Sequence, residues 1–316
     1  MAEEKLAGRP SRSTPHARLR RLEAVINPAS GHVGPHSAEQ IEAIAAEFGI
    51  AVRVAEASPR DIAPALKKAI GAAPDLVIIV AGDGTARMAA DLAGPEGPLI
   101  APLPGGTMNM LPRAIYGARS WQDALRETLA HGEVRTVSGG QIDNHTFYVA
   151  AIIGSPALWA GAREAMRFGK VGLAVSKARR ALAHAFSTGV HFSLDGGPRE
   201  KAEALTLICP LISRTMEDET ALEAIVLDPH GAGEAVRLAL KTMLADVIGD
   251  WRSDPAVRAQ PCRRAEVSTR GRLPVLLDGE PEWLGSRAEI RFRPAAFRVL
   301  APPLAAQAAP EAIIAP

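Results

Sequence analysis

The sequence predicts an α/β protein of two parts, a parallel α/β domain followed by a mainly antiparallel β domain. From Leu22 to about His131, short β-branched runs alternate with helical patterns, which is typical of βαβ units in a parallel sheet covered on both faces. After about Val134, period-two runs separated by turns indicate an antiparallel sheet or sandwich. A length of 316 residues fits two domains of ordinary size.

The first domain is expected to open with a strand at residues 22–26, followed by a loop at residues 27–34. The next segment carries apolar residues at helical spacing and ends at Gly49, and residues 50–54 form the second strand. Ser58 and Pro59 mark the start of the next helix, because serine can cap a helix and proline tolerates its first turn. This helix runs to Gly71.

Two central strands follow, and both end in glycine turns. Residues 76–80 are fully apolar, as expected of a buried strand in a parallel sheet, and they stop at the turn of residues 82–85. Residues 99–103 form the neighbouring strand, which stops at residues 104–107. Ligands of parallel α/β sheets gather beyond these carboxyl ends of the strands.

The second domain is expected to consist of short strands interrupted by two helical patterns. The strand runs are residues 140–153, 189–194, 204–209, 222–227, 265–268, 275–277 and 288–292, and the helical patterns cover residues 171–186 and 233–247. The predicted domain limits are residues 22–133 and 134–300, with a disordered basic tail at residues 1–21 and an Ala/Pro-rich tail at residues 301–316.

Composition argues against several classes of protein. The formal net charge is +1, so no global charge favours nucleic acid. The two cysteines, Cys209 and Cys262, lie far apart and in no metal-binding spacing. The most apolar stretch, residues 147–162, contains a Gly-Ser-Pro break and is shorter than the ~18 residues of a spanning helix. We therefore expect a cytoplasmic protein that does not bind nucleic acid.

Three loops at the ends of predicted strands outline a phosphate cradle. The first loop contains Asn27, Pro28, Ala29, Ser30 and Gly31, the second Ala81, Gly82, Asp83, Gly84 and Thr85, and the third Gly105, Gly106, Thr107 and Asn109. Glycine lets backbone N–H groups approach an anion, and hydroxyl and amide side chains add hydrogen-bonding groups. Each loop alone is more often an ordinary turn or helix cap. Their occurrence at equivalent positions of one sheet indicates a phosphate site.

Other nucleotide-binding signatures are missing from the sequence. There is no G-x-x-x-x-G-K-[ST] loop, no G-x-G-x-x-G fingerprint and no H-R-D or D-F-G element, which disfavours a Walker ATPase, a dinucleotide enzyme and a protein kinase. His32 and His36 are separated by Gly34 and Pro35, which break a helix, so a metal-binding histidine pair is not expected.

The three loops and a late Asp278-Gly279-Glu280 resemble the successive motifs of the diacylglycerol kinase and sphingosine kinase superfamily, which includes bacterial soluble lipid kinases. The resemblance covers about residues 22–300. Its first third is specific, and the middle is matched by pattern alone. It implies an NAD-kinase/diacylglycerol-kinase-like fold, in which an α/β nucleotide domain faces a β-sandwich lipid domain across a cleft.

The resemblance also implies a role for each motif. The three loops would bind ATP, and Asp278 and Glu280 would lie near a lipid hydroxyl, one of them as its proton acceptor. Asp83 and Asp278 would be partners of a catalytic Mg²⁺, and Asp218 and Glu219 are candidates for a second, structural Mg²⁺. Judged from its residues alone, Asp278-Gly279-Glu280 is a hairpin turn.

The chain departs from the family pattern at several positions. Ala81 stands where the family often has glycine, Arg87 and Met88 stand where it often has Asn-Glu, and Met110 replaces an aspartate. Residues 213–223 lack the glycines that accompany the structural magnesium in the bacterial branch. These departures leave an unusual substrate choice open.

The leading hypothesis is a lipid kinase that acts on diacylglycerol, a sphingoid base or a related lipid, peripherally at the inner membrane surface. A homodimer is an open option. One alternative is an NAD kinase-like small-molecule kinase, because that superfamily shares the glycine-aspartate-glycine loop and the two-domain plan. Another is a catalytically weakened module that binds lipid or nucleotide without turnover, in keeping with Arg87, Met88 and Met110.

Overall fold

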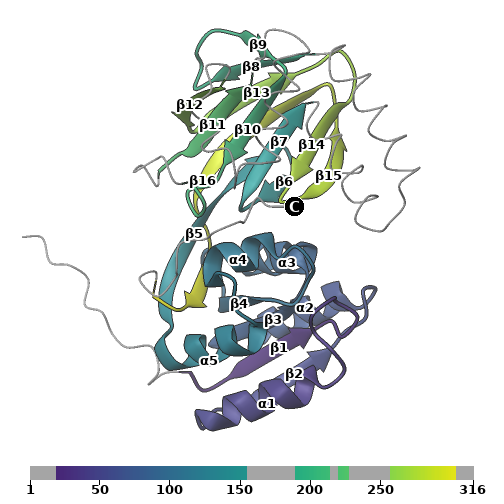
Figure 1. The fold of residues 1–316 in the computed structure, drawn as a ribbon, viewed down its shortest axis with the longest axis vertical. Helices are drawn as coiled ribbons and strands as arrows, with labels where there is room; N and C mark the ends of the chain where they lie inside the picture. The colour runs from purple at the N-terminus through teal and green to yellow at the C-terminus, as the bar shows by residue number, and fades with distance from the viewer. Residues whose placement is uncertain (1–18, 155–188, 214–219, 228–256, 304–316) are drawn as a thin grey trace, which may run out of the picture.

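The computed structural model describes residues 19–154, 189–213, 220–227 and 257–303. It shows two parts stacked along the long axis of the molecule (Figure 1). Helices and parallel strands form one part, and antiparallel strands form the other. The predicted fold class is therefore confirmed.

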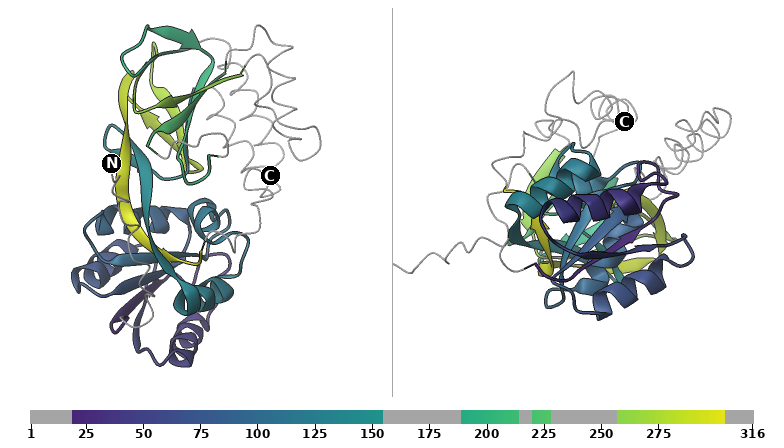
Figure 2. Two further views of the ribbon diagram at one scale, coloured as in Figure 1. Left: turned by 90° about the vertical axis from the view of Figure 1, so that its left-hand side faces the viewer. Right: turned by 90° about the horizontal axis from the view of Figure 1, so that it is seen from below.

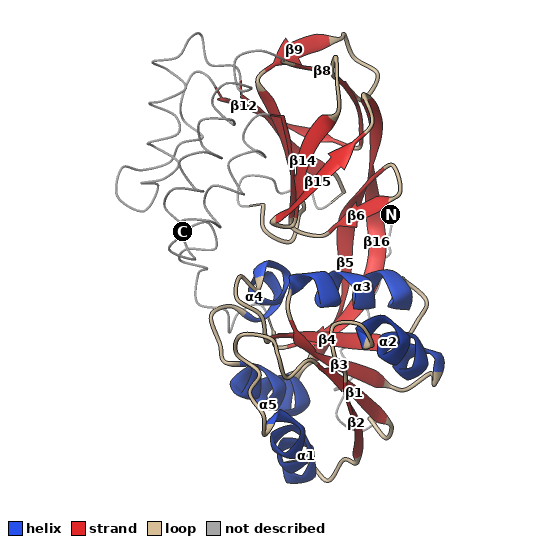
Figure 3. Ribbon diagram, turned by 90° about the vertical axis from the view of Figure 1, so that its right-hand side faces the viewer, coloured by secondary structure: helices blue, strands red, loops and turns tan. Residues whose placement is uncertain are grey.

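The first part is a parallel sheet with strand order β2-β1-β3-β4. All of β3 is buried, as expected of a central strand covered on both faces. Figure 3 shows α2 and α3 on one side of this sheet and α1 and α5 on the other. The elements are β1 (Leu22–Ile26), α1 (Ser37–Glu47), β2 (Val52–Glu56), α2 (Ile62–Gly71), β3 (Leu76–Ala81), α3 (Asp83–Ala93), β4 (Leu99–Pro104), α4 (Met110–Tyr116) and α5 (Trp121–His131).

Two predicted boundaries in this part are wrong, and hydrogen bonds explain both. The second strand begins at Val52 and not at residue 50, because the Ile50 N–H donates to the Ala45 carbonyl and closes the end of α1. The second helix begins at Ile62 and not at Ser58. Residues 58–61 instead form a turn in which the Asp61 N–H donates to the Ser58 carbonyl.

The second part is a sandwich of two sheets. One sheet has the order β12-β11-β10-β7-β14-β15, and the other contains β16, β13, β8 and β9 together with β5 and β6. Their facing sides share one apolar core that includes Phe147, Ile153, Phe192 and Leu205. The strands are β5 (Glu133–Ile142), β6 (His145–Phe147), β7 (Ala150–Gly154), β8 (Val190–Leu194), β9 (Glu200–Ala202), β10 (Ala204–Ile208), β11 (Leu222–Leu227), β12 (Val257–Cys262), β13 (Arg264–Ser268), β14 (Leu273–Leu277), β15 (Glu280–Leu284) and β16 (Arg287–Ala301).

Strands β5 and β16 run side by side through both parts (Figure 2). The second half of β16 pairs in parallel with β4 through Val299 and Ile100, so one sheet continues from the first part into the second. The register of β16 with β5 shifts between Arg293 and Phe297, around Pro294, which has no N–H to donate. This long strand extends the shorter one predicted at residues 288–292. The single run predicted at residues 140–153 is divided among three strands.

Several predicted features lie outside the described residues. They are the helical patterns at residues 171–186 and 233–247, the metal candidates Asp218 and Glu219, and most of both tails. Within the described part of the chain, no helix has the length and apolar character needed to cross a membrane.

Candidate active site

The second loop forms the N-terminus of α3. Gly82 is the N-cap residue with an extended backbone, and Asp83 begins the helix directly after β3 ends. The first N–H groups of a helix have no partner within the helix, and they carry the positive end of its dipole. This eleven-residue helix therefore directs the positive end of its dipole toward the carboxyl edge of the sheet, an arrangement that favours anions.

The third loop packs its backbone directly against the second loop. A Cβ atom on Gly105 would lie 2.6 Å from the Ala81 nitrogen, and one on Gly106 would lie 2.6 Å from the Gly82 Cα atom. Only glycine fits at such distances. Gly105 and Gly106 are thus needed for contact between the two loops, whereas the nearest atom to a Cβ on Gly82 would be 3.9 Å away.

Asn109 shapes the third loop from within. Its backbone is left-handed with φ of 54°, and the residue is buried. The side-chain Oδ1 accepts from the Gly106 N–H at 2.7 Å, and Nδ2 donates to the Gly106 carbonyl at 2.7 Å. Its amide therefore faces the loop, while Thr107 in the same loop is exposed.

Asp83 joins α3 to α4. Its Oδ1 accepts from the Leu111 N–H at 3.1 Å, and the N–H groups of Asn109 and Met110 also form hydrogen bonds with this carboxylate. Burial nevertheless raises the pKa of Asp83 to about 6, because desolvation of the charged form outweighs the hydrogen bonds that lower it.

The first loop is a turn held by its own asparagine. Asn27 Oδ1 accepts from the Ala29 N–H at 3.1 Å, and the Ser30 N–H donates to the Asn27 carbonyl at 2.9 Å. A Cβ on Gly31 would lie 3.2 Å from Thr107 Oγ1, so the first loop also adjoins the third.

His32 connects the first loop to the third. Its backbone N–H donates to the Gly105 carbonyl at 3.0 Å, and its ring Nδ1 lies 2.6 Å from the Gly106 carbonyl oxygen. The structure thus brings all three predicted loops together at one edge of the sheet. His32 holds loop backbone, a role that its sequence position alone does not reveal.

The Asp278-Gly279 pair forms the turn between β14 and β15, which confirms the hairpin interpretation. Both residues have positive φ, 49° and 86°, as a two-residue hairpin turn of this kind requires. The turn reaches the first part of the molecule. A Cβ on Gly279 would lie 2.9 Å from the Met110 sulfur and 3.3 Å from Met108 Cε.

Asp278 anchors this hairpin. The residue is only 5% exposed, and its carboxylate accepts from the N–H groups of Tyr148 at 2.8 Å, Val149 at 2.8 Å and Ala150 at 3.0 Å. Burial raises its pKa to about 6 in spite of these three hydrogen bonds. Its titration range therefore reaches toward neutral pH.

Glu280 extends from the hairpin over the first turn of α3. Its Oε1 lies 2.7 Å from the position that a Cβ on Gly84 would take, and its Oε2 accepts from Arg87 Nη2 at 2.8 Å. The sequence marked Arg87 only as a departure from the family pattern. Arg87 follows Gly84 by three residues, which puts both on one face of the helix. This spacing could have predicted from the sequence that Arg87 lies beside the second loop.

The metal candidates can be placed only in part. Among the described residues, no group of three or more His, Cys, Asp or Glu side chains is close enough to hold a metal ion. Asp83 and Asp278, the predicted magnesium partners, both bind backbone N–H groups. Asp218 and Glu219 lie outside the described residues.

Comparisons with known proteins agree with this arrangement. Residues 21–142, which contain all three loops, match the family profile described as the diacylglycerol kinase catalytic domain. No curated protein matches the sequence.

Solved structures from Bacillus anthracis strain Sterne are similar over 90% of this chain and 98% of theirs. A candidate diacylglycerol kinase has 19% identity and a TM-score of 0.67, and a diacylglycerol kinase has 17% identity and a TM-score of 0.65. These structures support the fold, and the family profile identifies the first domain. Residues 21–142 are therefore similar to the diacylglycerol kinase catalytic domain, and the chain as a whole shares its fold with these solved structures.

Proposed function

We propose that the chain is an ATP-dependent lipid kinase, which transfers the γ-phosphoryl group of ATP to a hydroxyl of diacylglycerol, a sphingoid base or a related lipid. One observation carries the proposal. The anion-binding end of α3 meets the carboxylate-bearing β14–β15 hairpin, with Glu280 Oε1 2.7 Å from the position of a Cβ on Gly84. Anion-binding N–H groups and a carboxylate side by side are what phosphoryl transfer to a hydroxyl requires.

The loops fit the phosphates of a nucleotide. Gly82 leaves its surroundings open, the first N–H groups of α3 point outward, and hydroxyl groups stand nearby on Ser30, Thr85 and Thr107. Mg²⁺ in such sites is held by one or two carboxylates together with phosphate oxygens and waters. Asp83 and Asp278 are the carboxylates that we propose for it.

When bound, ATP supplies the phosphoryl group and Mg²⁺ neutralises charge on its oxygens. A hairpin carboxylate orients the lipid hydroxyl and accepts its proton, while the bond from the hydroxyl oxygen to the γ-phosphorus forms and the bond to the ADP oxygen breaks. Burial raises the pKa of Asp278 to about 6, which suits proton acceptance, whereas a Mg²⁺ ion on this carboxylate would lower its pKa and leave Glu280 as the proton acceptor. Glu280 lies against the second loop. One of these two residues is the proton acceptor, and the other positions the reacting groups.

A lipid substrate also suggests where the protein works. Diacylglycerols and sphingoid bases reside in membranes, so we propose a cytoplasmic protein that visits the inner membrane surface. Juxtamembrane basic residues are worth about 1 kcal/mol each near an anionic surface. The basic residues that the sequence offers for this contact, at positions 9–21 and 177–180, lie almost entirely outside the described residues.

The function is tested with ATP labelled at the γ-phosphate, Mg²⁺ and mixed lipid extracts, followed by chromatography of the products. A labelled lipid supports the proposal. A labelled dinucleotide would instead identify an NAD kinase-like enzyme. Binding of ATP in calorimetry without any labelled product would identify a module that has lost turnover.

Paired substitutions separate the two carboxylates. Asp278→Asn and Glu280→Gln each keep the shape of the side chain and remove its charge. The variant that loses the base should show kcat lower by ~10²–10⁴-fold with ATP affinity nearly unchanged. The other should show a smaller defect. If both folded variants phosphorylate lipid at the rate of the parent, the hairpin is only a turn and this mechanism is wrong.

A further inference from the structure

Arg87 and Glu280 form an ion pair that joins the two parts of the molecule. Arg87 lies in α3, and Glu280 begins β15 directly after the hairpin turn. The Nη2–Oε2 distance is 2.8 Å, and the two side chains are 21% and 44% exposed. The pair therefore lies at the edge of the candidate site, next to the first turn of α3.

Gly84 makes room for this contact. A Cβ on Gly84 would lie 2.7 Å from Glu280 Oε1, a distance at which the carboxylate would have to move. Oε1 therefore rests against the helix at Gly84, while Oε2 is held by Arg87 one turn further along. The carboxylate is thus held by Arg87 through one oxygen, with the other beside Gly84.

The charges around Glu280 explain why it needs a partner. Burial is the main cause of the raised pKa of both Asp83 and Asp278; the charge of Glu280 raises that of Asp83 a little further, and the charge of Arg87 lowers that of Asp278 slightly. Arg87 is therefore a positive charge that pairs with Glu280 and also acts on Asp278, and it offsets the negative charge that Glu280 brings toward Asp83.

The stability gained from this pair is expected to be small. Partly exposed ion pairs contribute little to stability, because water screens their charges. The effect on the reaction rate can be much larger, because a displacement of a reacting or orienting group by about 1 Å can lower a rate by ~10²-fold. The ion pair would therefore matter mainly because it fixes the position of the Glu280 carboxylate.

We propose that Arg87 is a positioning residue, which holds the Glu280 carboxylate against the first turn of α3 and directs it toward the substrate hydroxyl. The inference rests on the proposed lipid kinase function and adds to it a residue that acts through Glu280. It holds for either role of Glu280, proton acceptor or orienting group.

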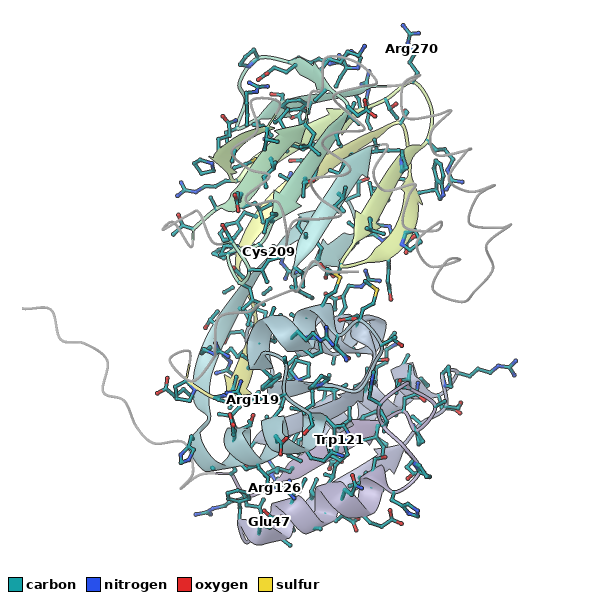
Figure 4. All side chains as sticks on the ribbon, viewed as in Figure 1. Glu47, Arg119, Trp121, Arg126, Cys209 and Arg270 are labelled. Atoms are coloured by element: carbon teal, nitrogen blue, oxygen red, sulfur yellow. The ribbon has the colours of Figure 1, made fainter. Side chains whose placement is uncertain are left out.

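The test compares Arg87→Met, Arg87→Lys, Glu280→Gln and the double variant Arg87→Met/Glu280→Gln. The control is Arg126→Met, which removes a similar ion pair with Glu47. Figure 4 shows Arg126 and Glu47 at the end of the first part that faces away from the second. Lipid phosphorylation gives kcat, calorimetry with ATP gives the dissociation constant, and thermal unfolding confirms that each variant is folded.

Arg87→Met is expected to lower kcat by ~10–100-fold while the ATP dissociation constant changes by less than ~3-fold. Arg87→Lys, which keeps the charge, should recover part of the rate. The double variant should be no slower than Glu280→Gln, because Arg87 has nothing left to position. Arg126→Met should behave like the parent.

Three results would overturn the inference while leaving the kinase function intact. They are an Arg87→Met variant as active as Arg126→Met, defects of Arg87→Met and Glu280→Gln that multiply in the double variant, and a loss of ATP affinity as large as the loss of kcat. The last would mean that Arg87 contacts the nucleotide itself. If the parent phosphorylates no lipid, the proposed function fails and the inference fails with it.

Discussion

The glycines of the three loops have different structural roles, although the sequence alone does not distinguish them. At Gly105 and Gly106 a side chain would collide with the backbone of the second loop, so these residues allow strand ends to pack. At Gly84 the atoms nearest to a side chain would be those of the Glu280 carboxylate. Gly82 has the most open surroundings of the four. That these glycines admit a phosphate stays a prediction, and the open surroundings of Gly82 favour the second loop for it.

Substitution of Gly84 should act partly through Glu280. In Gly84→Ala the methyl group displaces the Glu280 carboxylate, so we expect kcat to fall by ~10-fold with the fold intact. In a Glu280→Ala background there is no carboxylate to displace, and the same change should alter kcat by less than ~2-fold. Steady-state lipid phosphorylation measures both.

The larger Gly84→Val should abolish ATP binding as well, because it also blocks the approach of a phosphate to the helix end. Calorimetry on the folded variant is the measurement. If Gly84→Ala weakens ATP binding equally in both backgrounds, its methyl group hinders the phosphate directly and Glu280 is not involved.

Among the elements, the β14–β15 hairpin depends on its turn. Gly279 has φ of 86°, and a Cβ there would also lie 2.9 Å from the Met110 sulfur. Gly279→Ala should therefore lower the free energy of unfolding by ~1–3 kcal/mol and reduce kcat, because Glu280 follows directly. Urea unfolding measures the first effect.

Gly271→Ala is the matched control, since a Cβ there would meet no atom within 4 Å and its φ lies outside the positive range. Its effect should stay within ~0.5 kcal/mol. Equal destabilisation by the two substitutions would show that the hairpin turn carries no special strain.

Local patterns were sufficient for the elements whose neighbours along the chain are also neighbours in space. The apolar strand β3 and the glycine turn after it were visible in the sequence, and so was the hairpin turn at Asp278. The return of β16 to the first sheet was not, because Pro294 interrupts its pattern and the pairing of Val299 with Ile100 spans most of the chain. Likewise, no sequence pattern reveals that the Asn109 amide turns inward.

In the whole molecule, side chains from two places along α3 contact neighbouring strands. In its middle, Arg87 pairs with Glu280 of β15. Near its end, the carboxylate of Asp91 accepts hydrogen bonds from the hydroxyl groups of Tyr148 and Thr146. The N-terminus of α3 at Gly82 is the end proposed to bind phosphate. The contacts of Arg87 and Asp91 therefore help to place the β14–β15 hairpin over that end.

Stability should depend on pH through two buried carboxylates near this interface. The pKa of Asp83 and that of Asp278 are raised to about 6, against ~3.9 in an unfolded chain. A carboxyl group with a raised pKa binds its proton more tightly in the folded state. Its stabilising contribution is fully present below about pH 4 and is lost as the pH rises through about 6.

Asp278→Asn should remove one of these contributions. Between pH 4 and pH 7 the free energy of unfolding of the parent should fall relative to that of the variant by up to ~3 kcal/mol, because the parent must ionise a buried group and the variant does not. Asparagine leaves one of the three backbone N–H groups without an oxygen acceptor, a cost that does not vary with pH, so the slope of the difference is the quantity to compare. Urea unfolding at several pH values gives that slope, and Asn144→Ala, at an exposed position without a titratable group, should give none.

A flat difference between parent and Asp278→Asn would mean that the carboxylate ionises as easily in the folded protein as in the unfolded chain. Its three hydrogen bonds would then fully compensate for its burial, and Asp278 would lose the near-neutral pKa that suits a proton acceptor.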